Sequence, residues 1–179
     1  MKKIVLSMML VASLFAENND YVTLGGGVTQ FNLDTGPSNA STNNASYTFA
    51  LGHQYGNYGR IHMDGTYINA ASASIDSSAM ISLSYDFMFP VVDDIFSLYV
   101  GPVGGYTSYK TNTYDLSGGH YGVELGGVVS ITENFELELG ASYLKETGAG
   151  VSTFVSLDDA RSVYFHINYL FDGTKHFRY

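Results

Sequence analysis

Apolar and polar residues alternate along several stretches of this chain, which is the pattern of a strand whose two faces meet different surroundings. Between residues 79 and 89, for example, Ile81 and Tyr85 share one face, whereas Ser82 and Asp86 share the other. The pattern is clearest in four segments: residues 45–55, 79–89, 135–144 and 161–171. Four further segments read as strands: residues 20–32, 60–70, 95–108 and 118–130. The pattern therefore predicts eight strands.

The connections between these strands alternate between long and short. The long ones are residues 33–44, 71–77, 109–117 and 146–159, and the short ones are residues 56–59, 90–94 and 132–134. A barrel that runs up and down through a membrane, with loops at one end and turns at the other, has this alternation. We therefore predict an all-β fold, an eight-stranded antiparallel up-and-down transmembrane β-barrel.

The outward face of the predicted strands is rich in aromatic residues. Candidates for the lipid-facing surface and its aromatic girdles are Tyr47, Tyr55, Tyr67, Tyr85, Phe87, Tyr106, Tyr143, Phe165, Tyr169 and Phe171. A soluble barrel of lipocalin type would have the same alternation with the faces reversed. Its outer surface would then consist of Ser, Gly, Ala and Thr rather than the mixed charges of a soluble protein, so the membrane interpretation is favoured.

The N-terminus has the features of a secretory signal. Lys2 and Lys3 precede an apolar run over residues 4–15, which is too short to span a bilayer as a helix, and Ala16 precedes a polar stretch. We predict a cleavable signal peptide over residues 1–16, an outer-membrane barrel over residues 17–171 and a short periplasmic tail over residues 172–179. The sequence has no cysteine, which excludes a lipid-anchored lipoprotein and a disulfide-stapled domain.

Charge narrows the range of partners. Without Lys2 and Lys3, six cations remain against seventeen carboxylates. Such an acidic chain is unsuited to nucleic acid or to anionic lipid through a basic patch.

The whole predicted barrel resembles the small eight-stranded outer-membrane barrels, the group that includes the OmpA transmembrane domain, OmpX and the opacity-type adhesins. The resemblance rests on the alternating strands, on TENFELELG at residues 132–140 and on NYLF at residues 168–171. It implies a place in the outer membrane of a Gram-negative cell. In barrels of this group the last strand usually ends at an aromatic residue that the assembly machinery recognises. We assign this strand-closing role to Tyr169 and Phe171, with the terminal Phe177 and Tyr179 as the alternative.

The opposite face of the strands predicts a polar lumen. Its charged members are expected to be Arg60, His62, Asp64, Asp86, Glu124, Glu136, Glu138 and His166. In an eight-stranded ring, the third and seventh strands lie opposite each other, so the guanidinium of Arg60 is expected to pair with Glu136 or Glu138 across the lumen.

Candidate chemistry in the sequence is sparse. His62 and Asp64 could begin a metal site, but spacing fixes no third ligand. His166 and Asn168 could belong to an acyl hydrolase, but no serine stands beside them on that face. The glycine runs are interpreted as positions that relieve steric crowding where strands curve. The acidic pairs at residues 93–94 and 158–159 are interpreted as solvated side chains. We therefore predict no catalytic, cofactor or metal site and no enzymatic activity.

The sequence leaves three functions open. The first is a structural or adhesin-like role in which extracellular loops bind a host or surface ligand. The second is a narrow, porin-like passive channel with an acidic lumen, and the least favoured is a lipid-modifying enzyme. The expected partners are outer-membrane lipid, lipopolysaccharide and the barrel-assembly machinery.

Overall fold

The structure is a computed structural model that describes residues 20–34, 39–69, 77–92, 95–110, 115–147, 150–152 and 155–171. The predicted signal peptide and the predicted periplasmic tail both lie outside these residues. Among the described residues, no helix is long and apolar enough to cross a membrane.

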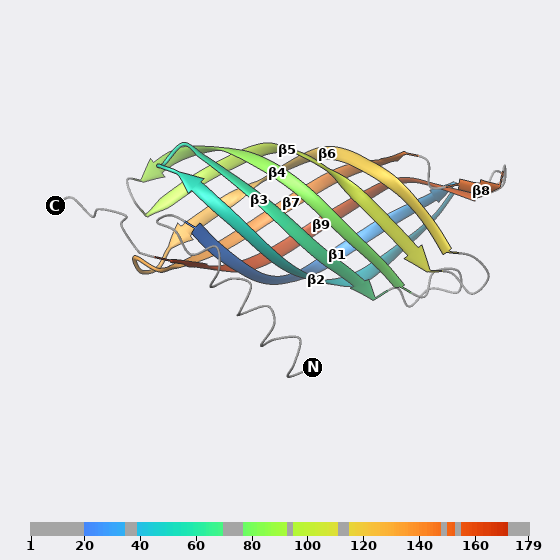
Figure 1. The fold of residues 1–179 in the computed structure, drawn as a ribbon, viewed down its shortest axis with the longest axis horizontal. Helices are drawn as coiled ribbons and strands as arrows, with labels where there is room; N and C mark the ends of the chain where they lie inside the picture. Colours follow the sequence, from blue (N-terminus) through green and yellow to red (C-terminus); the bar gives the residue numbers. More distant parts are fainter. Residues whose placement is uncertain are drawn as a thin grey trace.

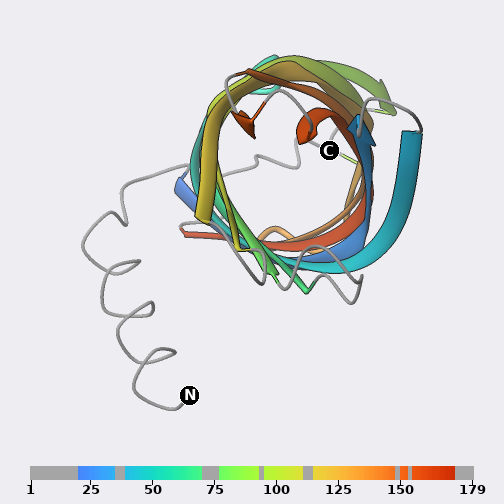
Figure 2. The same ribbon diagram turned by 90° about the vertical axis from the view of Figure 1, so that its right-hand side faces the viewer.

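The chain forms one antiparallel sheet that closes on itself (Figures 1 and 2). Its strands are β1 (Asp20–Asp34), β2 (Asn39–Tyr55), β3 (Gly59–Asn69), β4 (Ser77–Val92), β5 (Phe96–Lys110), β6 (Asp115–Ser130), β7 (Phe135–Thr147), β8 (Gly150–Ser152) and β9 (Val155–Leu170). Each strand pairs with the next, except that β9 pairs with both β7 and β1, and the short β8 pairs with β9. Eight strands therefore make the ring, and the predicted eight-stranded up-and-down barrel is confirmed.

The first and last strands close the barrel in an antiparallel ladder with one register shift, between Asn32 and Leu33. Tyr21 pairs with Leu170 at one end of the contact between β1 and β9, and the ladder runs to the pair of Asp34 and Ser156 at the other. The Phe171 amide donates to the Asp20 carbonyl at 2.8 Å. Closure leaves no unpaired edge along this seam, as a strand within lipid requires.

The two ends of the barrel differ. At one end, here called the turn end, β2 meets β3 through residues 56–58 and β6 meets β7 through residues 131–134. Gly56 has a φ of +59° in the first of these turns, a conformation that a glycine adopts without steric cost. The opposite end, here called the loop end, carries the short β8 (Figure 1).

Several predicted loops are shorter than expected, which corrects the element boundaries. The predicted loop over residues 33–44 narrows to residues 35–38, because β1 continues to Asp34 and β2 begins at Asn39. The predicted loop over residues 146–159 contains β8 and the beginning of β9. The added residues include many polar ones, such as Ser41, Asn43 and Asn44, so the alternation that marks the central part of each strand is weak there.

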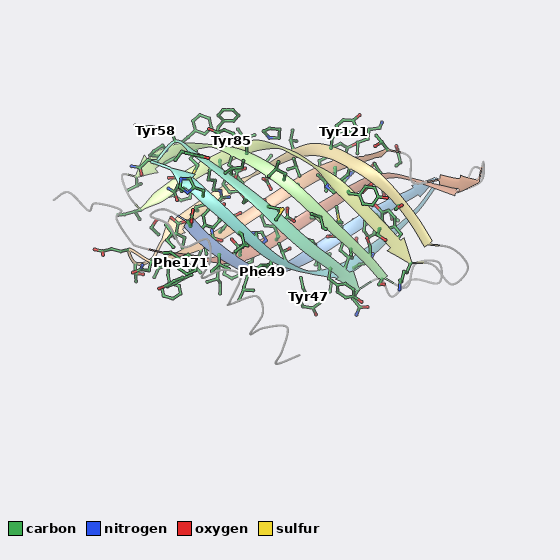
Figure 3. The ribbon with its side chains drawn as sticks, viewed as in Figure 1. Tyr47, Phe49, Tyr58, Tyr85, Tyr121 and Phe171 are labelled. Atoms are coloured by element: carbon green, nitrogen blue, oxygen red, sulfur yellow. The ribbon has the colours of Figure 1, made fainter. Side chains whose placement is uncertain are left out.

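The outward face matches the predicted lipid surface. Its exposed aliphatic residues include Leu24, Val28, Met63, Ile81, Leu83, Leu98, Val100, Val123, Leu125, Leu139, Val163 and Ile167. Exposed tyrosines near the loop end are Tyr47, Tyr67, Tyr106, Tyr121 and Tyr143. Aromatic residues near the turn end are Tyr55, Tyr58, Tyr85, Phe87, Phe89, Phe135, Tyr169 and the half-buried Phe171. Figure 3 shows Tyr58, Tyr85 and Phe171 toward the turn end and Tyr121 toward the loop end. An apolar belt between two aromatic rings is the surface of a membrane barrel.

Candidate functional site in the barrel lumen

A buried arginine lies at the centre of the lumen near the turn end. Arg60 on β3 is 2 % exposed, and its register partner on β4 is Asp86. Arg60 Nε donates to Asp86 Oδ2 at 2.5 Å, and Arg60 Nη1 donates to Glu138 Oε2 on β7 at 2.8 Å. The predicted pair between Arg60 and Glu138 is therefore present across the barrel.

Glu138 connects this arginine to three further strands. Its Oε1 accepts from the hydroxyl of Tyr99 on β5 at 2.8 Å, and its Oε2 accepts from Asn168 Nδ2 on β9 at 3.0 Å. Thr23 Oγ1 on β1 in turn donates to Asn168 Oδ1 at 2.7 Å. The Glu138 carboxylate thus binds side chains from β3, β5 and β9 directly and is linked to β1 through Asn168, which fixes its position in the lumen.

Aromatic rings surround the same charges. The guanidinium carbon of Arg60 lies 4.5 Å from the centroid of the Tyr99 ring, a distance at which a cation is attracted to the ring face. The Tyr99 hydroxyl lies 2.9 Å from that of Tyr164, which donates to Glu124 Oε2 at 3.2 Å. Tyr164 also stacks on His166 with centroids 4.4 Å apart. The charged layer is therefore packed by large side chains.

The remaining charged residues predicted for the lumen lie around this layer. His166 Nδ1 is 3.4 Å from Glu138 Oε1, and Asp64 Oδ1 accepts from Thr66 Oγ1 at 3.1 Å. Glu136, the predicted alternative partner of Arg60, accepts from Ser130 Oγ at 3.2 Å.

His62 lies between two carboxylates rather than beside Asp64 alone. Its Nδ1 is 3.7 Å from Asp86 Oδ2, and its Nε2 is 3.5 Å from Glu124 Oε1. The residues that could together bind a metal ion are therefore His62, Asp86 and Glu124. Asp64, which the sequence offered as a possible partner of His62, is not among them. Asp86 and Glu124 come from different strands, so spacing along the chain could not reveal them.

A small chamber lies beside the charged layer. Its volume is about 60 Å³, enough for several water molecules, and its walls include His62, Asp64, Glu124 and His166. Threonines and serines line much of the rest.

Buried apolar clusters lie on both sides of these polar groups. Along the inward face of β4, Met88 near the turn end is followed by Asp86, then by two serines, then by Met80. Met88 packs in a buried cluster with Tyr99 and Val128. Toward the loop end, the buried cluster consists of Phe31, Ile68, Met80, Val103, Tyr109, Leu144 and Ala160. The polar groups are thus enclosed within the barrel.

A second polar group near the loop end was missed by the sequence analysis. Thr107 Oγ1 lies 2.7 Å from His120 Nδ1 and donates to Glu146 Oε1 at 3.0 Å, while His120 Nε2 lies 3.1 Å from Ser82 Oγ. Glu146 fell in a predicted loop, although it continues the inward positions of Glu138 along β7. His120 has the same parity as Glu124 on β6, so strict alternation could have found both.

The uncharged members of the central network were not predicted to belong to it, although the sequence drew attention to Asn168 beside His166. Tyr99, Tyr164 and Asn168 carry no charge, whereas the lumenal residues were predicted from their charge. Alternation did place Tyr164 and Asn168 inward. The serine nearest to His166 in sequence, Ser162, has its Oγ 2.9 Å from Thr29 Oγ1.

Comparison with known proteins identifies the fold. No protein-family model and no curated protein sequence matches the chain. Among solved structures, the chain is similar to Neisserial surface protein A (NspA), with 17 % identity, a TM-score of 0.69 and coverage of 85 % of this chain and 97 % of that one. It is also similar to outer membrane protein H (OprH) from Pseudomonas aeruginosa, with 20 % identity, a TM-score of 0.56 and coverage of 86 % and 99 %. The N-terminal β-barrel domain of Pseudomonas aeruginosa OprF matches with 11 % identity, a TM-score of 0.53 and coverage of 85 % and 98 %.

These likenesses show that the chain has the fold of the small eight-stranded outer-membrane barrels, as its sequence suggested. The exposed apolar belt and its two aromatic rings are a surface that only lipid covers without cost. The fold and the belt together place the protein in the outer membrane.

Proposed function

We propose that the protein is a non-conducting outer-membrane barrel that acts at the cell surface through its loop end, in an adhesin-like or structural role. The observation that carries this proposal is the dense packing of buried side chains in the lumen. Phe31 at 0 % exposure and Tyr109 at 2 % exposure pack edge to face with centroids 5.8 Å apart, near the loop end. Arg60 and its partners fill the section near the turn end.

The same layers count against the passive channel that the acidic sequence allowed. An ion entering from either end would have to displace buried apolar side chains before reaching the carboxylates. It would also have to separate Arg60 from Asp86 and Glu138, contacts of 2.5 and 2.8 Å. An eight-stranded barrel leaves an interior just wide enough for side chains.

The loop end supports a surface role. Exposed polar side chains beyond the ring of tyrosines include Ser41, Asn43, Asn69, Ser108, Lys110, Ser117, Lys145, Thr147, Asp158 and Arg161. They lie on hydrogen-bonded strands, so a binding partner would contact a surface whose backbone is held in place. A rigid surface lowers the entropy cost of binding. Lipopolysaccharide at the outer leaflet and a surface ligand are the proposed partners.

Conductance and adhesion measurements test the proposal together. The purified barrel in a planar lipid bilayer should show no discrete current steps, while a general porin in the same bilayer gives them. Bacteria that express the barrel should adhere to host cells or to a surface matrix better than bacteria that express a variant with residues 39–44 exchanged for an unrelated polar sequence of equal length. Steady unitary currents from the wild-type barrel would support the channel and overturn the proposal. Equal adhesion of both strains, with equal surface display, would remove the adhesin-like role.

A further inference from the structure

We propose that His62, Asp86 and Glu124 form a binding site for one divalent transition-metal ion of the zinc type inside the lumen. One potential ligand atom from each residue can be chosen so that all three lie within 4.8 Å of one another. The three residues come from β3, β4 and β6, so a bound ion would tie three strands together from within. The proposal goes beyond the surface role and does not depend on it.

The geometry suits an ion of this size. A zinc ion binds imidazole nitrogen at about 2.0–2.1 Å and carboxylate oxygen at about 2.0–2.2 Å, so two ligand atoms on one ion lie roughly 3.4 Å apart. His62 Nε2 and Glu124 Oε1 are 3.5 Å apart, close to that spacing and too far apart for a good hydrogen bond. Small side-chain rotations would bring in an oxygen of Asp86.

The ligand atoms are buried and lack other partners. Asp86 is 0 % exposed, and neither its Oδ1 nor Glu124 Oε1 has a hydrogen-bond partner among the described residues. Buried polar atoms without partners are costly, and each one calls for an explanation. A metal ion bound by Asp86 Oδ1 and Glu124 Oε1 would satisfy both of these oxygen atoms at once.

The charges around the site have the right balance. Asp86, Glu124 and Glu138 carry three negative charges when ionised, whereas Arg60 supplies one positive charge among them. The excess of two negative charges equals the charge of one divalent ion. Arg60 does not block the site, because it holds Asp86 through Oδ2 and leaves Oδ1 unused. Carboxylates that bind a metal are commonly held in this way by a neighbouring donor.

The donor set selects the kind of metal. Imidazole nitrogen with carboxylate oxygen suits zinc and neighbouring first-row ions, whereas magnesium and calcium prefer oxygen ligands alone. The adjoining chamber of about 60 Å³ could supply water as a fourth ligand. Three protein ligands and one open position are a common zinc geometry.

Metal loading of the refolded chain tests the site directly. The untagged full-length chain is folded in detergent micelles with Zn²⁺, passed over a chelating resin, and analysed for zinc per chain by mass spectrometry. The wild type should retain close to one ion, and folding with Mg²⁺ alone should leave no bound ion. His62→Gln and Glu124→Gln should each lower zinc retention at least tenfold.

His166→Gln is the matched control, since His166 is a lumenal histidine whose side chain has the same 12 % exposure as that of His62. It should retain zinc at the wild-type level. Gel mobility before and after boiling verifies that each variant is folded. If His62→Gln fails to fold, X-ray absorption of the zinc-loaded wild type decides, because the site predicts one imidazole nitrogen and otherwise oxygen ligands. Zinc below about one ion per ten folded wild-type chains, equal loss in His166→Gln, or a ligand shell without a single imidazole would overturn the proposal.

Discussion

Replacing Arg60 with methionine should destabilise the barrel more than replacing any exposed cation. Methionine keeps most of the apolar stem but removes the guanidinium that binds Asp86 at 2.5 Å and Glu138 at 2.8 Å. Glu138 retains its hydrogen bonds from Tyr99 and Asn168, whereas Asp86 loses the hydrogen bond that Arg60 Nε donates to it. Removing one partner of a buried ion pair commonly costs about 3 to 5 kcal/mol in the free energy of unfolding. We expect Arg60→Met to fall in that range.

Urea unfolding in lipid vesicles at pH 7 measures this cost. Lys145→Met is the matched control, because Lys145 is 53 % exposed and lies 4.0 Å from Asp158, so its loss should change the free energy of unfolding by less than about 1 kcal/mol. Combining Arg60→Met with Glu138→Gln should recover part of the loss, with a coupling energy of about 0.5 to 3 kcal/mol. A single variant Arg60→Met that unfolds at the wild-type urea concentration would refute the reasoning.

Three further substitutions examine other parts of the barrel. Tyr109→Ala should cost about 3 kcal/mol in urea unfolding yet give no conductance in planar bilayers, because the layer near the turn end still closes the lumen. Gly122→Ala should reduce the yield of folded barrel, since an added Cβ would collide with the backbone of the neighbouring strand; Gly65→Ala, where the nearest atom is 4.0 Å away, should fold normally on the same boiling-shift gel. Leu139→Arg, at a position 62 % exposed in the middle of the belt, should cost about 2 to 4 kcal/mol, whereas Tyr143→Arg at the ring of tyrosines should cost about 1 kcal/mol or less in the same vesicles.

The central part of each strand could be predicted because its two faces meet different surroundings. Leu139 faces lipid and Glu138 faces the lumen, so apolar and polar residues alternate in the sequence with a period of two. The strand ends could not be predicted in this way. Beyond the ring of tyrosines the outward face is polar as well, and Asn43 and Asn44 continue the ladder between β1 and β2. The alternation therefore marks where the lipid ends rather than where the strand ends.

Contacts across the lumen were predictable only in part. The opposition of Arg60 and Glu138 followed from counting strands around an eight-membered ring and from the starting points of two strands. The grouping of His62 with Asp86 and Glu124 depends in addition on how far each strand is shifted along its neighbour. In a barrel that shift is a property of the closed ring, which no single strand pattern contains.

The order of layers in the lumen explains why its charged groups depend on one another. Apolar clusters lie on both sides of the layer that contains Arg60, so bulk water cannot reach that layer freely. Under such conditions a carboxylate is stable only with a hydrogen-bond donor, a cation or a proton of its own. Arg60, Tyr99 and Asn168 serve Glu138 in this way, but the described residues offer Asp86 Oδ1 and Glu124 Oε1 no donor. The packing that argues against a channel thus also leaves these two oxygen atoms without ready access to water, and the proposed divalent ion would satisfy both of them.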